Sequence, residues 1–239
     1  MSVLPPIEEK ATYVEQMFAR IAPGYDRMNR VMTFGLDQPW RRQVVAAVAP
    51  PIGGRVLDIG TGTGDFLPLL ADWVGDGEVL GLDFCVPMMV AGQAKVAALP
   101  QRVAAFIGGD ALHLPFPDNS FDAITTGFAM RNVTDISAAF REMWRVARPG
   151  AAMACLEVAR PRQALVRLGH RIYFEQVVPL LGSFLGGDRR AYTYLPQSAR
   201  NFPRPAHLAQ LMRDVGWVDV TYRLLGLGAV AIHVGVKVG

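Results

Sequence analysis

The chain has 239 residues, 51% of them hydrophobic and 19% charged, which excludes a disordered chain and suffices to bury the core of one α/β domain. Its formal net charge is +3, and lysines and arginines are spread along the chain without a basic run, so nucleic acid is not an expected partner. The same mild excess of positive charge suits either ordinary solubility or contact with an anionic membrane surface.

The N-terminus does not resemble a signal peptide, because acidic residues and prolines lie between Met1 and Lys10 where an apolar stretch would be needed. No stretch reaches the roughly 18 uninterrupted apolar residues of a membrane span. We expect a cytoplasmic protein, with peripheral contact at the inner face of the cell membrane left open. Cys85 and Cys155 lie in core-like segments and are predicted to be buried, reduced thiols.

Two helices are predicted ahead of the sheet. The apolar positions from Ile7 to Gly24 fit the first. Trp40, Val44 and Val48 recur at helical spacing in the second, which should end before Pro50.

From Arg55 onward, strand-like and helix-like patterns alternate, which predicts parallel βαβ units. Past Pro161 the pattern changes to an insertion, and the chain closes with a helix from Pro205 to Val215 and a strand hairpin. The predicted strands are Arg55–Ile59, Val79–Asp83, Val103–Ile107, Phe121–Thr126, Ala152–Val158, Val218–Leu224 and Ala229–Val236.

We predict a single domain of residues 1–239 with four parts. These are an N-terminal helical segment (1–50), a ligand-binding core (51–160), an apolar insertion (161–204) and a C-terminal helix with its hairpin (205–239).

Three alternate glycines, Gly60, Gly62 and Gly64, follow the first predicted strand, and such a turn lets a ligand approach the backbone closely. A dinucleotide fingerprint would place its third glycine at position 65, but Asp65 stands there, and a carboxylate at a helix start disfavours a pyrophosphate. Asp58 and Asp65 instead offer negative charge to the ammonium and sulfonium of S-adenosylmethionine. We predict this cofactor, with Asp58, Gly60 and Gly62 at its site. A glycine turn of purely structural use is the alternative.

Two further acids end predicted strands. Asp83 ends the second strand, where a carboxylate can bind both hydroxyls of a ribose, and its alternative role is to cap the helix that begins at Val86. Asp110 ends the third strand, where it can accept a hydrogen bond from an adenine amino group, with Ala111 beside it.

Several motifs together resemble the C-methyltransferases of ubiquinone and menaquinone biosynthesis, and the likeness runs over almost the whole chain. The resemblance implies a Rossmann-like class I S-adenosylmethionine-dependent methyltransferase, with a mostly parallel seven-stranded sheet, helices on both faces and N-terminal lid helices. The motifs are Tyr25-Asp26-x-Met28-Asn29, Phe34-Gly35, Gly62-Thr63-Gly64-Asp65, Leu114-Pro115-Phe116-Pro117-Asp118-Asn119, Arg131-Asn132-Val133-Thr134-Asp135 and Leu156-Glu157.

The resemblance also places cofactor contacts at Thr63, Asp83, Asp110 and Ala111. A serine that bacterial ubiquinone-pathway members carry aligns with Gly127 in this chain, which favours a naphthoquinone substrate.

The reaction that the resemblance implies is methylation of a ring carbon in a polyprenylated demethylated quinol, with demethylmenaquinol favoured. A ubiquinone-pathway benzoquinol, another small-molecule acceptor and a non-catalytic quinone-binding assembly protein remain alternatives. A nicotinamide oxidoreductase is disfavoured by Asp65 and Asp110. No metal is predicted, because the four histidines share no ligand-like spacing.

The predicted catalytic residues are Arg131, Asn132, Tyr25 and Asp26. Since a guanidinium stays protonated, we expect Arg131 to stabilise a developing phenolate, with Asn132 holding the same oxygen. An ion pair between Arg131 and Asp135 or Glu142 is the alternative. Tyr25 and Asp26 would belong to a lid that excludes water, although Tyr25 could equally pack its own helix.

An apolar stretch from Ile172 to Leu185 is richer in hydrophobic residues than an ordinary connection needs. It is predicted to line a tunnel for the isoprenoid tail or to enter the membrane interface, with core packing as the alternative. Nearby Arg167, Arg171, Arg189 and Arg190 would suit anionic headgroups or plain solvent. A homodimer is also left open.

Overall fold

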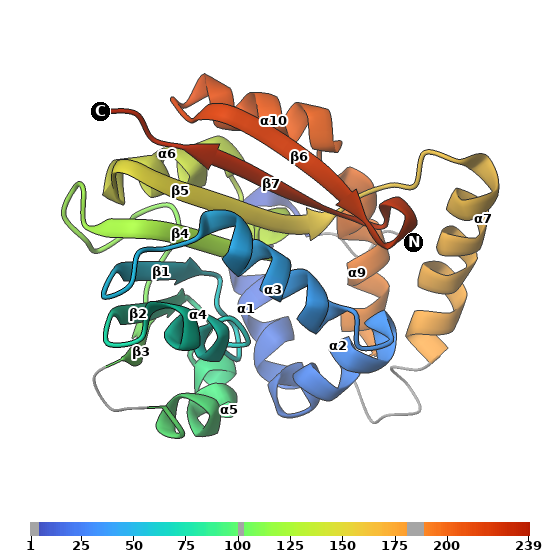
Figure 1. Cartoon of the computed structure of the whole chain (residues 1–239). Helices are drawn as coiled ribbons and strands as arrows, with labels where there is room; N and C mark the ends of the chain where they lie inside the picture. Colours follow the sequence, from blue (N-terminus) through green and yellow to red (C-terminus); the bar gives the residue numbers. More distant parts are fainter. Residues whose placement is uncertain (1–4, 100–102, 181–188) are drawn as a thin grey trace.

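The computed structural model describes residues 5–99, 103–180 and 189–239, and its centre is a seven-stranded sheet with strand order β3-β2-β1-β4-β5-β7-β6 (Figure 1). The first five strands are parallel, and β7 runs antiparallel to both β5 and β6. The strands are β1 (Arg55–Ile59), β2 (Glu78–Asp83), β3 (Ala104–Gly108), β4 (Phe121–Gly127), β5 (Ala147–Val158), β6 (Val218–Leu225) and β7 (Val230–Val236).

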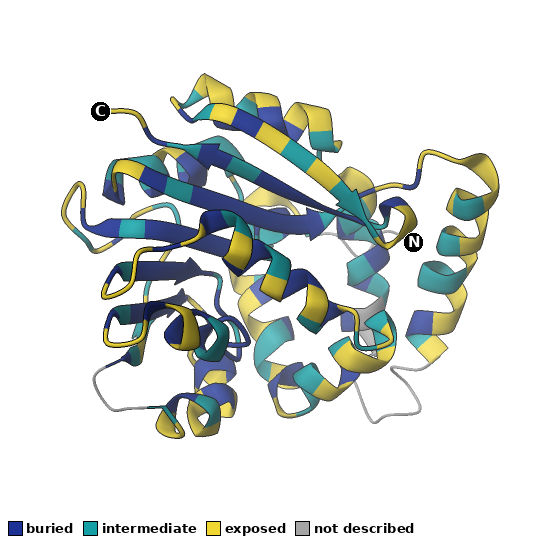
Figure 2. Ribbon diagram, viewed as in Figure 1, coloured by how far each residue is buried: buried dark blue, intermediate teal, exposed yellow. Residues whose placement is uncertain are grey.

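Helices cover both faces of this sheet because the strands are apolar on both sides (Figure 2). Side chains alternate along a strand, so Leu57 and Ile59 enter one core whereas Val56 enters the other. The first core is closed by α6 (Ile136–Val146) and α10 (Pro205–Asp214), and the second by α3 (Asp37–Val48), α4 (Leu67–Val74) and α5 (Val86–Ala97).

From residue 5 onward, three α-helices precede the sheet, so the prediction of two was wrong. Pro23 and Gly24 end the first helical run in a short 3-10 turn, η2 (Ala22–Gly24), and a new helix begins at once. That helix ends where Phe34 adopts a left-handed conformation (φ 53°) ahead of Gly35. Besides η2 and α3, the elements before the sheet are η1 (Ile7–Glu9), α1 (Lys10–Ile21) and α2 (Tyr25–Thr33).

Among the described residues of the insertion, α7 (Ala164–Ile172) and α9 (Arg189–Asn201) differ in how they pack on the rest of the fold. In α9, Tyr194 packs against Val14 and Met17 of α1. By contrast, α7 contains no buried residue and lies at the periphery of the fold (Figures 1 and 2). It continues into a π-helical turn, η4 (Tyr173–Val177).

The predicted fold class is confirmed, and the strand boundaries agree closely except at β5, which begins at Ala147 rather than Ala152. The difference arises because Ala147 already pairs with Phe121 across a register shift in the β4–β5 ladder. Of the predicted apolar stretch, Leu181, Phe184 and Leu185 lie outside the described residues. Across the described ranges, no helix combines the length and apolar content needed to cross a membrane.

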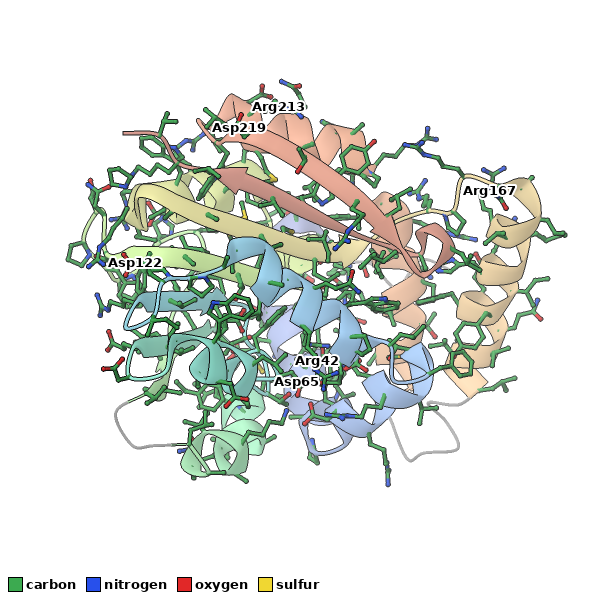
Figure 3. The ribbon with its side chains drawn as sticks, viewed as in Figure 1. Arg42, Asp65, Asp122, Arg167, Arg213 and Asp219 are labelled. Atoms are coloured by element: carbon green, nitrogen blue, oxygen red, sulfur yellow. The ribbon has the colours of Figure 1, made fainter. Side chains whose placement is uncertain are left out.

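The edge of the sheet formed by the amino ends of the parallel strands carries different charged residues from the edge formed by their carboxyl ends. Asp122, at the start of β4, pairs with Arg148 and accepts a hydrogen bond from the backbone of Arg55, which ties the amino edge together. Asp65 lies toward the opposite, carboxyl edge (Figure 3). Ligands of open α/β sheets bind at the carboxyl edge, so this edge is where the predicted site residues should gather.

Candidate active site

A cavity of about 240 Å³ opens at the carboxyl edge of the sheet. Five of the predicted cofactor residues line it together, although they come from three different strand ends. They are Gly60, Gly62, Asp83, Asp110 and Ala111. Apolar side chains such as Ile59, Leu82, Met88 and Met130 complete the walls.

The glycine turn needs glycine for both conformation and space. Gly60 and Gly62 have φ values of 65° and 56°, in the left-handed region that other residues avoid. A Cβ at Gly60 would also lie 2.3 Å from the Cβ of Ala129. The turn therefore brings bare backbone to the cavity wall.

Asp83 fixes this turn to the end of β2. Its Oδ2 accepts a hydrogen bond from the backbone N–H of Gly62 and its Oδ1 accepts one from Cys85, each at 2.8 Å. The alternative role of capping α5 is not seen, because Cys85 holds the cap position. Burial raises the pKa of Asp83, while these backbone donors favour its charged form.

Two of the predicted cofactor residues, Asp58 and Thr63, lie behind the cavity wall rather than in it. Asp58 is 1% exposed and accepts a 2.8 Å hydrogen bond from Thr125. Burial raises the pKa of Asp58 to about 7, although hydrogen bonding by neighbouring threonines acts in the opposite direction. Thr63 donates instead to Asp26 on α2, at 2.5 Å.

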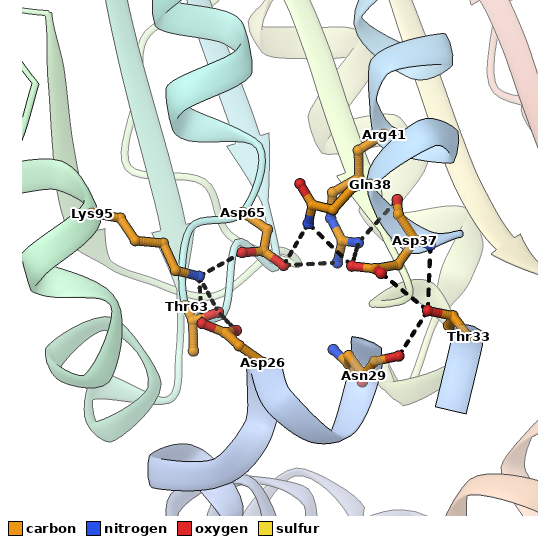
Figure 4. Close-up of polar contacts among 9 residues, drawn as sticks. All are labelled: Asp26, Asn29, Thr33, Asp37, Gln38, Arg41, Thr63, Asp65 and Lys95. Carbon is orange, nitrogen blue, oxygen red and sulfur yellow. Dashed lines mark hydrogen bonds and ion pairs between the residues drawn. The ribbon is translucent and has the colours of Figure 1, made fainter. Parts of the chain in front are cut away.

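A network of ion pairs joins the N-terminal helices to the glycine turn (Figure 4). Lys95 on α5 contacts Asp26 at 2.6 Å and Asp65 at 2.5 Å, and Arg41 on α3 contacts Asp65 at 3.7 Å and Asp37 at 3.0 Å. Burial disfavours the charge of Asp65, but Arg41 and Lys95 outweigh it and lower its pKa.

This network changes the interpretation of Asp65. The sequence suggested that its charge faces the cofactor, whereas the structure turns its carboxylate toward Lys95 and Arg41, outside the residues that line the cavity. Asp26 likewise faces Lys95 and Thr63, where it connects α2 to the turn. Sequence reasoning missed Lys95 because 30 residues separate it from Asp65.

Arg131 lies just past β4 and forms a buried ion pair with Glu157, the end of β5, at 3.2 Å. The alternatives of Asp135 and Glu142 are excluded by this contact, and Asp135 instead caps α6 by accepting a hydrogen bond from Ala138. Arg131 also donates to the carbonyl of Phe128, whose φ of 59° is strained for a bulky residue. Its Nε–H is buried and has no hydrogen-bond partner within the described part of the chain.

A second, smaller hollow of about 40 Å³ adjoins the cavity between α1, α2, α9 and the loop after β4. Tyr25 and Asn132 line both spaces, and Phe18, which packs on Tyr25 with ring centroids 5.9 Å apart, does so too. Arg131 and Tyr194 line the hollow on its other side.

Tyr194 is the functional candidate that sequence reasoning missed. Its hydroxyl donates to Oδ1 of Asn132 at 3.3 Å, and the side chain is 2% exposed. Burial raises its pKa, while the charge of Arg131 acts in the opposite direction. The only local signal was a tyrosine on the apolar face of a helix, which is also typical of ordinary packing.

Gly127 lines the cavity at the end of β4. A Cβ at this position would lie 2.6 Å from Cε2 of Phe66, which is itself buried. The serine contact of ubiquinone-pathway members therefore has no room here unless Phe66 moves.

The parallel sheet with its reversed β7, and the cavity at the carboxyl edge over a glycine turn, define a class I methyltransferase. The chain belongs to the ubiE/COQ5 methyltransferase family, whose model matches residues 7–237.

Relatives with similar sequences agree with this assignment. A demethylmenaquinone methyltransferase of Roseiflexus castenholzii is 66% identical, covering 100% of this chain and 99% of the relative. One from Deinococcus radiodurans is 42% identical over 98% of this chain and 97% of its own length.

Among solved structures, an S-adenosylmethionine-dependent methyltransferase of Aquifex aeolicus shares the fold, with a TM-score of 0.60 and 22% identity over 83% of this chain and 89% of that one. The phosphoethanolamine N-methyltransferase 2 of Haemonchus contortus, solved with S-adenosylmethionine, has a TM-score of 0.61 and 15% identity over 84% of this chain and 53% of that one.

Proposed function

We propose that this methyltransferase moves a methyl group from S-adenosylmethionine to a ring carbon of a polyprenylated demethylmenaquinol. The observation that carries the proposal is the junction between the cavity and the hollow beside it, because the polar side chains of Asn132 and Tyr25 line both spaces. The names of the Roseiflexus and Deinococcus relatives support the same substrate. The closed position at Gly127 supports a naphthoquinol over a benzoquinol.

The residues of the cavity fit S-adenosylmethionine. Asp83 presents a buried carboxylate suited to ribose hydroxyls, and Asp110, Ala111 and Leu112 line the same cavity. The bare backbone of Gly60 and Gly62 allows the cofactor to approach the turn closely. When bound, the cofactor supplies an electrophilic methyl group on a sulfonium, and we propose that Asp58 and Thr63 support its site from behind the wall.

Arg131 would increase the reactivity of the acceptor ring. A phenol-like hydroxyl titrates near about pH 10, so the site must favour its ionised form. The Nε–H of Arg131 is a buried donor with no protein partner among the described residues, which suits a developing phenolate oxygen. Asn132, oriented by the hydroxyl of Tyr194, would hold the same oxygen.

The N-terminal helices would close the site. Tyr25 contributes a wall between cavity and hollow, and Asp26 fastens α2 to the glycine turn through Lys95 and Thr63. Such closure excludes water and aligns donor with acceptor.

We also propose peripheral contact with an anionic membrane through α7. Leu165, Leu168 and Ile172 lie at helical spacing and are 82%, 53% and 45% exposed. Arg167, labelled in Figure 3, and Arg171 are on the same helix and are exposed. An amphipathic helix with basic flanks is suited to the headgroup region, where a polyprenylated substrate resides.

The test is transfer of labelled methyl from S-adenosylmethionine to a demethylated naphthoquinol and to a demethylated benzoquinol, each kept reduced. We expect labelling of the naphthoquinol by the wild type. Asn132→Ala should lose most of this activity while still binding S-adenosylmethionine. Absence of label from the naphthoquinol, with cofactor bound, would contradict the proposal, and preferential labelling of the benzoquinol would reassign the substrate.

A further inference from the structure

A groove of about 700 Å³ runs outward from the hollow, between the start of α1, the first turn of α6, α9 and α10. Arg131 and Tyr194 line both the hollow and this groove, so they mark its inner end. Val133 and Thr134 line both the groove and the cofactor cavity. The three spaces therefore adjoin one another around the loop that follows β4.

The polarity of the residues that line the groove changes along its length. Its inner end is polar, since Lys10 lies there and donates to the carbonyls of Arg131 and Val133 at 3.2 and 2.6 Å. Its outer walls are more apolar and include Ile7, Ile136, Phe202, Pro203 and Leu211, together with the polar side chains of Asp135, Ser137, Ser198 and Asn201.

This distribution of polar and apolar residues indicates which kind of ligand the groove can bind. The basic residues that line the groove, Lys10 and Arg131, are both at the inner end and already hold backbone or carboxylate oxygens. A ligand with several negative charges along its length would meet apolar walls. A hydrocarbon chain attached to an oxygenated ring matches both ends.

We infer that this groove binds the ring-proximal isoprenoid units of the acceptor's tail, while the quinol ring lies where the cavity, the hollow and the groove meet, beside Asn132. The inference rests on the proposed function for the identity of the ring. It assigns the tail to a surface formed by α6, α9 and α10, which is separate from the exposed face of α7.

Ser137 offers a direct test, because it lines the groove as a small, partly exposed residue in the first turn of α6. Ser137→Trp should fill the groove, and Ser137→Ala is the matched control that leaves it open. The probes are 1,4-naphthoquinone with and without a geranyl tail. Both are used oxidised, so that binding is measured by calorimetry without methyl transfer.

We expect the wild type and Ser137→Ala to bind the geranylated probe with similar affinity, and Ser137→Trp to bind it about tenfold more weakly or worse. The tail-less probe should bind all three proteins alike. Leu211→Trp, on the opposite wall, should repeat the result if Ser137→Trp does not fold, with S-adenosylmethionine binding as the check of folding.

Equal affinity of the Trp variants and the wild type for the geranylated probe would overturn the inference. So would a wild type that binds the tail-less probe as tightly as the geranylated one. Because binding is measured apart from turnover, a protein that passes this test but methylates no quinol would refute the proposed function and leave the groove assignment standing.

Discussion

Arg131 and Glu157 form an ion pair at 3.2 Å in which the two side chains are 5% and 1% exposed, directly below the strained turn at Phe128. The pair joins the ends of β4 and β5 at the edge where the cavity of about 240 Å³ opens. Because Arg131 both holds this turn and carries an Nε–H that no described residue accepts, its structural and chemical contributions must be separated.

Arg131→Ala should lower the free energy of unfolding by about 3–5 kcal/mol, since it leaves the carboxylate of Glu157 buried and unpaired. The double variant Arg131→Met with Glu157→Gln should recover most of this stability but not methyl transfer. Urea denaturation and the labelled-methyl assay measure the two effects. Recovery of activity in the double variant would show that Arg131 serves the fold alone.

Lys95→Met should raise the KM for S-adenosylmethionine by about fivefold, because Asp26 and Asp65 then repel each other and loosen the contact between α2 and the glycine turn. Steady-state kinetics at fixed acceptor concentration measures this change. Asp72→Asn, an exposed charge change on α4, is the control and should leave the KM unaltered. An unchanged KM in Lys95→Met would mean that the network does not support the cofactor site.

Gly127→Ser should destabilise the protein by about 1–3 kcal/mol, because the new side chain would overlap Phe66. Thermal unfolding monitors the loss. Adding Phe66→Leu to Gly127→Ser should restore part of it by making room for the hydroxymethyl group. Equal melting temperatures for Gly127→Ser and the wild type would show that Phe66 yields easily and does not close this position.

The pH dependence of stability should carry a contribution from Asp58. Its pKa is raised to about 7 in the folded protein from an ordinary value of 3.8, so the folded state binds more protons than the unfolded state between these values. The contribution of Asp58 to stability therefore falls as the pH rises from about 4 to about 7.

The comparison with Asp58→Asn isolates this contribution, since asparagine keeps an oxygen acceptor for Thr125 but cannot ionise. The free energy of unfolding of the wild type minus that of the variant should be larger at pH 5 than at pH 8. A difference that stays constant across this range would place the pKa of Asp58 outside it.

Leu168→Glu should weaken binding to anionic lipid vesicles by about tenfold, because it puts a carboxylate in the apolar stripe of α7. Vesicle co-sedimentation at low and high salt measures the effect, and binding of the wild type should fall as salt rises. Val90→Glu, at a 67% exposed position on α5, is the matched control. An equal loss in both variants would mean that added charge, and not the face of α7, determines binding.

The amino-acid sequence by itself determined the order of the strands and which of the predicted site residues meet at the carboxyl edge of the sheet. Apolar runs such as Arg55–Ile59 identify buried parallel strands, and such strands place Gly60, Asp83 and Asp110 at one edge of the sheet. These inferences succeeded because they depend on local periodicity and on the geometry common to every parallel sheet.

Only the tertiary structure decided which charged side chains meet. Arg131 pairs with Glu157 across 26 residues, Lys95 with Asp65 across 30, and Tyr194 reaches Asn132 across 62. A sequence gives the sign of each charged side chain but not the direction in which the side chain points. Asp65 was therefore predicted to face the cofactor, whereas its partners are Lys95 and Arg41. Pairing of this kind depends on how α3, α5 and α9 pack on the sheet, and that packing is set by the whole core.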